Sequence, residues 1–160
     1  MIILYIIIIL YSLYSCLILY FWKAWKSIPN YSASDTIPQT SISIIIPARN
    51  EEKNIGALLL SLQQQSYPRG LFEIIVVDDH STDGTVGIVQ QYPLVKLIKL
   101  MDDNLNSFKK KAIETGIAAS VGNLIITTDA DCIPARNWLR TIALFKEEKE
   151  SVLIAAPVVF

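Results

Sequence analysis

The sequence predicts an α/β fold with a mostly parallel sheet that has helices on both faces, preceded by one transmembrane helix. Two observations predict this arrangement. From Ser41 onward, short runs rich in β-branched residues alternate with segments of helical periodicity, and no internal repeat is present. Before that point, residues 1–22 carry no charge. A chain of 160 residues is long enough for one domain with a substantial core and too short for two ordinary domains.

Residues 1–22 are expected to form the transmembrane helix. At 1.5 Å per residue they extend about 33 Å, slightly more than the hydrocarbon core of a bilayer. A cleaved signal peptide is a poorer interpretation, because no Lys or Arg precedes the apolar run and no small-x-small cleavage site follows it. The segment ends in an aromatic belt and two lysines: Tyr20, Phe21, Trp22, Trp25, Lys23 and Lys26. Because positive residues favour the cytoplasmic side, we expect a single-pass membrane protein with a cytoplasmic C-terminal domain.

Residues 27–40 are rich in Pro, Ser, Thr and Asn and cannot bury enough apolar surface to fold on their own. We therefore divide the chain into a transmembrane helix with its flank (1–26), a linker (27–40) and a folded domain (41–160). The 15 acidic and 14 basic residues leave a formal charge of −1. This balance gives no reason to expect nucleic acid as a partner.

Apolar runs predict the strands. The first, residues 42–47, contains four isoleucines without alternation, which is typical of a strand buried on both faces. The remaining strands are expected at residues 73–79, 95–100, 124–131 and 152–160.

Segments of helical periodicity separate these strands. Asn50 is a suitable cap for a helix that begins at Glu51 and ends near Gln65, and the acidic first turn suits the positive end of the helix dipole. Further helices are expected over residues 85–91, over residues 109–120 and from Pro134 onward, where proline can occupy the first turn.

Polar segments follow three of the strands, at residues 47–51, 78–84 and 129–131. In such a sheet, ligands bind beyond the carboxyl ends of the strands, so these segments predict the site. Clustered carboxylates repel one another unless a cation lies among them, and Mg²⁺ or Mn²⁺ commonly occupies an all-oxygen site. Asp129 and Asp131 are two residues apart, so on a strand both would face one side, and a bend after it could aim either at the metal.

Other polar residues in these segments have simpler interpretations. Asp83 precedes Gly84 and a helix, as a helix cap or turn former does. His80 is expected to be a turn residue, because nothing nearby in the sequence is arranged to orient it as a base. Lys109 starts a run of three lysines at a helix start, where cations oppose the helix dipole. An anionic ligand nearby would explain why three positive charges stand at the start of a helix.

Three motifs stand in this order along the chain: SIIIPARNEEKNI (43–55), IIVVDDHSTDGT (74–85) and TTDADCIP (127–134). They resemble the opening strand and loop, the second strand and the DxD region of glycosyltransferase family 2. Members of this family are inverting enzymes with a GT-A fold that use nucleotide-diphosphate sugars. The resemblance covers Ser41 to Phe160.

The resemblance implies a role for each strand end. It places the first loop near the ribose and base, with Asp78 or Asp79 contacting the base, and leaves the order within that pair open. It implies that Asp131 ligates the metal directly and that Asp129 meets the metal and the sugar or ribose. The candidate nucleotide-sugar-binding residues are Pro47, Ala48, Arg49, Glu51, Asp78, Asp79, Lys109 and Asp129, and the candidate ligands of Mg²⁺ or Mn²⁺ are Asp131 and Asp129.

The implied function is inverting, metal-dependent transfer of a sugar from a nucleotide-diphosphate donor, with UDP as the family's commonest carrier, to a lipid or glycan acceptor. The family's catalytic base lies well downstream of the DxD region, so we expect it beyond Phe160 and expect this chain to hold the donor-binding half. A non-catalytic, membrane-attached nucleotide-sugar-binding module is an alternative. A receiver-like domain phosphorylated at Asp129 is a more distant alternative, because little of the sequence remains to supply the Thr/Ser and Lys that a receiver needs at later strand ends, and the first strand and helix would be surplus.

Overall fold

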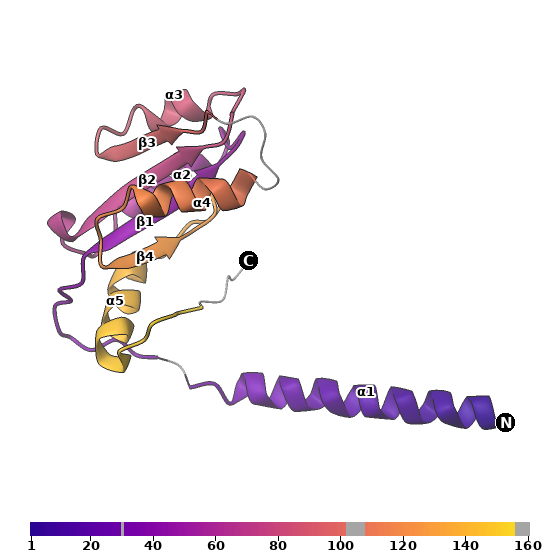
Figure 1. The fold of residues 1–160 in the computed structure, drawn as a ribbon. Coiled ribbons are helices and arrows are strands. Elements are labelled where there is room, and N and C mark those ends of the chain that lie inside the picture. Colours follow the sequence, from indigo (N-terminus) through magenta and orange to yellow (C-terminus); the bar gives the residue numbers. More distant parts are fainter. Residues whose placement is uncertain (30, 102–107, 156–160) are drawn as a thin grey trace. The chain divides into compact units, whose positions relative to one another are not determined.

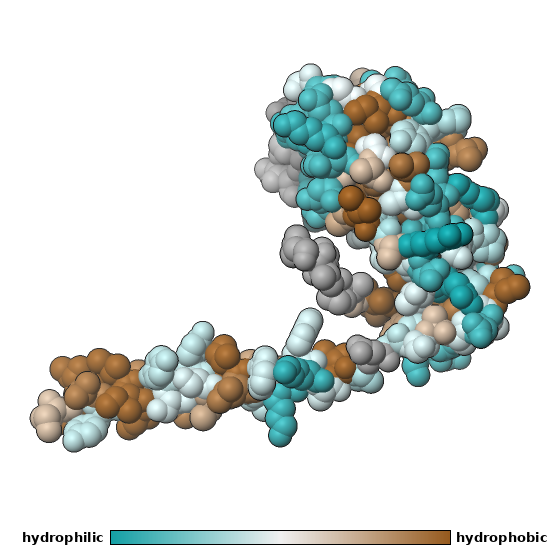
Figure 2. All heavy atoms as spheres, turned by 180° about the vertical axis from the view of Figure 1, so that it is seen from behind, coloured by the Kyte–Doolittle hydropathy of each residue, from teal (hydrophilic) through white to brown (hydrophobic). Residues whose placement is uncertain are grey.

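The computed structural model describes residues 1–29, 31–101 and 108–155, and the chain divides into two compact units between Ser32 and Ala33. The first unit consists mainly of helix α1 (Ile2–Lys26). Among the described residues it is the one helix long and apolar enough to cross a membrane. Figure 2 shows brown, hydrophobic side chains interspersed with pale ones along α1, and the strongly hydrophilic ones lie toward its C-terminal end, whose last turn contains Lys23 and Lys26. By length and composition, α1 is a candidate membrane span.

A parallel sheet forms the centre of the second unit, with the strand order β3-β2-β1-β4 in the described residues (Figure 1). The strands are β1 (Ile42–Ala48), β2 (Phe72–Asp78), β3 (Val95–Lys99) and β4 (Leu124–Thr127). Every residue of β1 except Pro47 is buried, because isoleucine side chains fill both faces of this inner strand. The predicted parallel sheet is confirmed.

Helices cover both faces of the sheet. They are α2 (Ile55–Gln63), α3 (Thr85–Val89), α4 (Phe108–Ala118) and α5 (Trp138–Lys149), with a 3₁₀ turn at Arg69–Leu71. Side chains alternate along β2, so Ile74 and Val76 pack in a cluster with α2, α3 and α5. Ile75 and Val77 point the other way and pack with Ala112 of α4, which lies in front of the sheet in Figure 1. This layering exposes the carboxyl ends of the strands.

Two glycines allow close approach to β1. A Cβ on Gly116 of α4 would overlap the side chain of Ile45. A Cβ on Gly122, just before β4, would lie 2.5 Å from the backbone nitrogen of Ser43. A side chain at position 116 would crowd the packing of α4 on β1, and one at position 122 would crowd the approach of the chain to β1 just before β4.

The loop after β1 differs from the prediction. The expected helix start at Glu51 is wrong, since α2 begins at Ile55 and residues 51–54 form a turn closed by a 3.0 Å bond from the Asn54 N–H to the Glu51 carbonyl. Asn50 does not cap α2. It adopts a left-handed backbone, with φ of 57°, and its side chain bonds the loop after β2.

The later boundaries also differ. Strand β4 ends at Thr127 and not at Asp131, because a turn follows in which the Cys132 N–H donates to the Asp129 carbonyl at 3.3 Å. Helix α5 begins at Trp138 rather than Pro134, and its Leu139 N–H donates to the Gln65 side chain at 3.1 Å. Residues 152–155 of the last predicted strand are not in a strand, and residues 156–160 lie outside the described part of the chain.

The segment before β1 is bonded to α5. One carboxylate oxygen of Glu147 accepts the backbone N–H groups of Gln39 and Thr40 at 2.9 Å and the Thr40 hydroxyl at 2.7 Å. The Tyr67 hydroxyl donates to the Thr40 carbonyl at 2.6 Å, and burial together with the charge of Glu147 raises the pKa of Tyr67 to about 12. The second unit therefore begins within residues 27–40, at Ala33.

Candidate functional site

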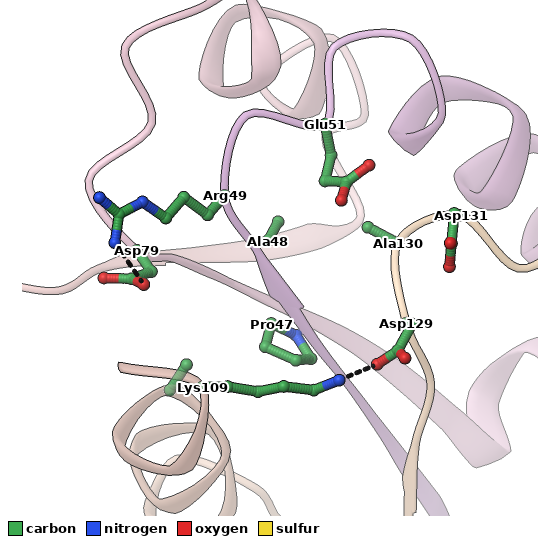
Figure 3. Close-up of a pocket in the computed structure, with 10 residues that line it drawn as sticks. Pro47, Ala48, Arg49, Glu51, Asp79, Lys109, Asp129, Ala130 and Asp131 are labelled. Atoms are coloured by element: carbon green, nitrogen blue, oxygen red, sulfur yellow. Dashed lines mark ion pairs between the residues drawn. The ribbon is translucent and has the colours of Figure 1, made fainter. Parts of the chain in front are cut away.

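A pocket of about 470 Å³ opens where β1, β2 and β4 end and α4 begins (Figure 3). Its lining residues are Pro47, Ala48, Arg49, Glu51, Asp79, Lys109, Ala112, Asp129, Ala130 and Asp131. The structure thus brings together all the predicted site residues except Asp78. Sequence reasoning did not single out Ala112 or Ala130. Ala112 was detectable, because it follows Lys109 by three residues and so shares its helix face.

Asp79 is the buried carboxylate of this pocket. Its side chain is 7% exposed, and its two oxygens have different neighbours. The Arg49 guanidinium lies 3.5 Å from Oδ2, and Nδ1 of His80 lies 2.9 Å from Oδ1. The Asp79 N–H donates to the Ala48 carbonyl at 2.8 Å, which extends the β1–β2 pairing beyond the strand ends. The expectation that nothing orients His80 is therefore wrong.

Asp78 does not line the pocket. Its side chain is buried, and its Oδ1 has no hydrogen-bond partner among the described residues. Successive side chains of a strand point to opposite faces, so only one residue of this pair can face the pocket. Here that residue is Asp79.

Asp129 and Asp131 lie beyond the end of β4, on the opposite side of the pocket from Asp79 (Figure 3). Both are exposed. Because the chain turns here, the geometry of an ideal strand does not apply to them, and their orientations follow from the turn. Asp129 forms an ion pair with Lys109, with 2.7 Å between the Lys109 Nζ and the Asp129 Oδ1. Lys110, the next residue of α4, pairs instead with Glu114 at 3.8 Å.

Hydrogen bonds join the loops after β1 and β2. The Asn50 N–H donates to the Ser81 hydroxyl at 3.0 Å, and the Asn50 side-chain oxygen accepts the Thr82 N–H at 2.8 Å. Asp83 accepts the backbone N–H and hydroxyl of Thr85, as expected of a turn former. The Thr85 hydroxyl bond is the main cause that lowers the pKa of Asp83, against a raising effect of desolvation. The two loops therefore present Arg49 and Asp79 on one connected frame.

The donor set at the turn fits a hard divalent cation. Asp129 and Asp131 offer carboxylate oxygens, which Mg²⁺ and Mn²⁺ prefer, and a site for Mg²⁺ usually takes its remaining ligands from substrate phosphates and water. No group of three His, Cys, Asp or Glu side chains in the described ranges could hold a metal by itself. The fit is therefore to a metal shared with a phosphate ligand.

The sequence from residue 43 to residue 160 matches the family description "Glycosyl transferase family 2". The chain belongs to glycosyltransferase family 2. Glycosyltransferase AglE of Haloferax volcanii is 36% identical over 101 residues, which are 61% of this chain and 33% of that protein. Poly(ribitol-phosphate) β-N-acetylglucosaminyltransferase TarS of Staphylococcus aureus is 34% identical over 110 residues, covering 68% of this chain and 19% of TarS.

Solved structures of the family 2 type share the fold. A structure of residues 1–349 of S. aureus TarS in complex with UDP-GlcNAc matches with a TM-score of 0.59 and 31% identity, over 69% of this chain and 32% of that one. The mannosyltransferase PcManGT of Pyrobaculum calidifontis, in complex with GDP-Man and Mn²⁺, matches with a TM-score of 0.63 and 30% identity. That match covers 80% of this chain and 39% of PcManGT. The GT-A fold expected from the three motifs is confirmed.

The family 2 chain described here is short beside its relatives. The matching part spans 33% of the length of AglE and 19% of the length of TarS. Its pocket combines the first loop, the second-strand carboxylate and the DxD turn, which are the parts that the sequence motifs predicted to act together.

Proposed function

We propose that this chain forms the donor-binding half of an inverting, metal-dependent glycosyltransferase. The observation that carries the proposal is the pocket in which Asp79, Lys109 and the DxD turn meet at the carboxyl edge of a parallel sheet. The complexes of the similar proteins with UDP-GlcNAc and with GDP-Man and Mn²⁺ support a nucleotide-diphosphate sugar as the ligand class.

The two sides of the pocket suit different parts of such a donor. We assign the loop residues Ala48 to Glu51, together with Asp79, to the nucleoside. Asp131 and Asp129 would hold Mg²⁺ or Mn²⁺, with Asp129 also near the sugar or ribose. Lys109 is assigned to the diphosphate, since a lysine at the start of a helix places its charge beside an anion. Asp78 has no assigned role in donor binding, because it does not line the pocket.

The chemistry is a single displacement. The hydroxyl oxygen of the acceptor forms a bond to the anomeric carbon of the sugar, and the bond from that carbon to the diphosphate oxygen breaks. The nucleoside diphosphate leaves with the electron pair, and the hydroxyl proton passes to a carboxylate base that we place beyond Phe160. A bound divalent cation supplies charge neutralisation at the leaving diphosphate.

We further propose that residues 1–26 anchor the protein in a membrane and that the first part of the predicted linker, residues 27–32, connects this anchor to the unit that begins at Ala33. Lys23 and Lys26 in the last turn of α1 favour a cytoplasmic domain. Attachment to a membrane favours a lipid or a membrane-associated glycan as acceptor. Protease treatment of sealed, right-side-out vesicles should leave the domain intact. Cleavage of the domain without detergent would show that it lies on the outer side and would contradict the proposed orientation.

The direct test measures UDP binding to the full chain in detergent by calorimetry, with and without Mn²⁺. We expect Mn²⁺ to strengthen UDP binding to the wild type at least tenfold, and Asp131→Asn to remove that enhancement, because one of the two charged oxygen ligands is lost. Asp35→Asn is the matched control, since Asp35 is exposed, carries the same charge and does not line the pocket. Equal Mn²⁺ enhancement in wild type and Asp131→Asn would overturn the site assignment.

A further inference from the structure

His80 occupies an unusual position next to the buried carboxylate of the pocket. Its Nδ1 lies 2.9 Å from Oδ1 of Asp79, and its side chain is 30% exposed while that of Asp79 is 7% exposed. Arg49 approaches the other oxygen of the same carboxylate at 3.5 Å. The carboxylate is therefore held from two directions at the pocket wall.

The backbone sets the place of the His80 ring. His80 has φ of 57°, in the left-handed region that residues with a side chain rarely adopt. The two residues that follow are both bonded to the facing loop, Ser81 through its hydroxyl and Thr82 through its N–H. His80 thus sits in a turn held between the end of β2 and these bonds, and strain of this kind persists where the surrounding structure determines the conformation.

The pair has a defined donor and acceptor. An ionised carboxylate can only accept hydrogen bonds, so Nδ1 of His80 must be the donor in this contact. Each carboxylate oxygen has two acceptor sites. His80 and Arg49 therefore leave Asp79 with acceptor capacity for a ligand in the pocket, while they restrict the rotation of its side chain.

We propose that His80 is a positioning residue for nucleobase recognition, which rests on the proposed function. By donating to Asp79, His80 holds the carboxylate in the orientation from which it accepts a ring N–H of the base. Uracil and guanine offer a ring N–H at their pairing edge, whereas cytosine presents an unprotonated ring nitrogen there. The His80–Asp79 pair therefore contributes to discrimination between UDP and CDP.

Two substitutions separate positioning from folding. Glycine accepts φ of 57° without strain but lacks a donor, so His80→Gly retains the turn and loses the contact to Asp79. Asparagine tolerates the left-handed region and carries an amide N–H that can donate to the same carboxylate. Asn50→Gly is the matched control, because Asn50 has the same φ in the facing loop and its side chain bonds Thr82 rather than Asp79.

The experiment measures UDP, GDP and CDP affinity of the full chain with Mn²⁺, together with thermal unfolding. We expect the wild type to bind UDP or GDP more tightly than CDP, and His80→Gly to reduce that ratio about tenfold while its melting temperature stays the same or rises. His80→Asn should restore most of the ratio. Asn50→Gly should lower the affinity for all three nucleotides to the same extent and leave the preference over CDP unchanged.

The outcomes distinguish the two proposals. An unchanged ratio in His80→Gly, or a parallel loss of affinity for all nucleotides, would overturn the positioning role and leave the proposed function intact. No preference over CDP in the wild type would remove base recognition by Asp79, and the positioning role with it. Absence of Mn²⁺-dependent nucleotide binding in the wild type would instead contradict the proposed function.

Discussion

The two carboxylate-bearing sides of the pocket differ in how firmly their side chains are held. Asp79 is buried and lies between Arg49 and His80, and the loops that carry it are joined by hydrogen bonds. Asp131 and Asp129 lie on an exposed turn, and Asp129 forms an ion pair with Lys109. The first side is organised before a ligand arrives. The second is suited to be completed by a ligand and a cation, so stability and binding should respond differently to substitutions on the two sides.

Asp79→Ala is expected to have the largest effect, because it changes both the stability of the fold and the affinity for the ligand. Removing the buried carboxylate takes away its contacts with His80 and Arg49 and should cost about 2 kcal/mol of unfolding free energy. UDP affinity should fall by about 100-fold. Asp131→Asn provides the contrast, with an unfolding free energy within about 0.5 kcal/mol of the wild type, since exposed substitutions rarely cost more. Urea unfolding and calorimetry check both values, and similar stability losses in the two variants would contradict the comparison.

Asn50→Ala tests whether the hydrogen bonds between the loops make the first side rigid. The change leaves the Thr82 N–H without its acceptor and places alanine at a left-handed φ, so we expect a loss of about 2 kcal/mol. Asn50→Gly relieves the backbone strain and should recover part of that loss. Hydrogen exchange of residues 81–85 should accelerate in both variants, and unchanged exchange would show that other contacts hold the loop.

Glu147 lies outside the pocket, so a substitution there should change the stability of the fold without altering either side of the pocket. Burial raises its pKa, but hydrogen bonds from Thr40 and Gln39 outweigh this and hold the pKa below the ordinary 4.5. A lowered folded-state pKa means that the contribution to stability is present above pH 4.5 and is lost as the pH falls through the folded value. Glu147 is exposed and solvent screens its charge, so Glu147→Gln should be less stable by only about 0.5 kcal/mol at pH 7.

Below pH 4.5 the difference between Glu147→Gln and the wild type should narrow, because protonation removes the same charge from the native side chain. Thermal unfolding between pH 3 and pH 7 measures this effect, with UDP affinity at pH 7 as the control. A stability gap that stays constant over this range would contradict the assignment.

Lys109→Gln is expected to have the smallest effect on the fold. Lys109 and Asp129 are both more than half exposed, so the pair should contribute within about 0.5 kcal/mol. UDP affinity should fall about threefold, and less at high salt, because the charge faces the diphosphate. Lys110→Gln is the matched control on the same helix. Equal losses of UDP affinity in both variants would show that Lys109 acts only through its general positive charge, and would contradict its specific role at the diphosphate.

The sequence predicted the strands and the approximate place of the site better than the loops. The four isoleucines of β1 and the apolar run of β2 mark buried strands, and the rule that ligands bind at their carboxyl ends brought distant residues together correctly. The loop after β1 was misjudged, because Glu51 and its neighbours look like a helix start. Their backbone N–H groups instead donate to side chains at the end of the loop after β2 and the start of α3. One example is the 2.7 Å hydrogen bond from the Glu51 N–H to the Thr85 hydroxyl.

His80 shows the same limit at the level of one side chain. Its contact with Asp79 depends on a left-handed backbone and on bonds from a loop about thirty residues earlier, and neither is visible in the local sequence. Local propensity describes a residue by its neighbours along the chain, whereas the role of His80 arises from neighbours across the sheet edge.

The close packing of α4 against β1 gives the protein a way to change the pocket from outside it. Gly116 lies seven residues after Lys109, two helical turns along the same helix, and has no room for a Cβ above Ile45. A side chain at position 116 would overlap Ile45, so either Ile45 or α4, whose first turn forms one wall of the pocket, would have to shift. A shift of α4 would change the width of the pocket without replacing a residue that lines it.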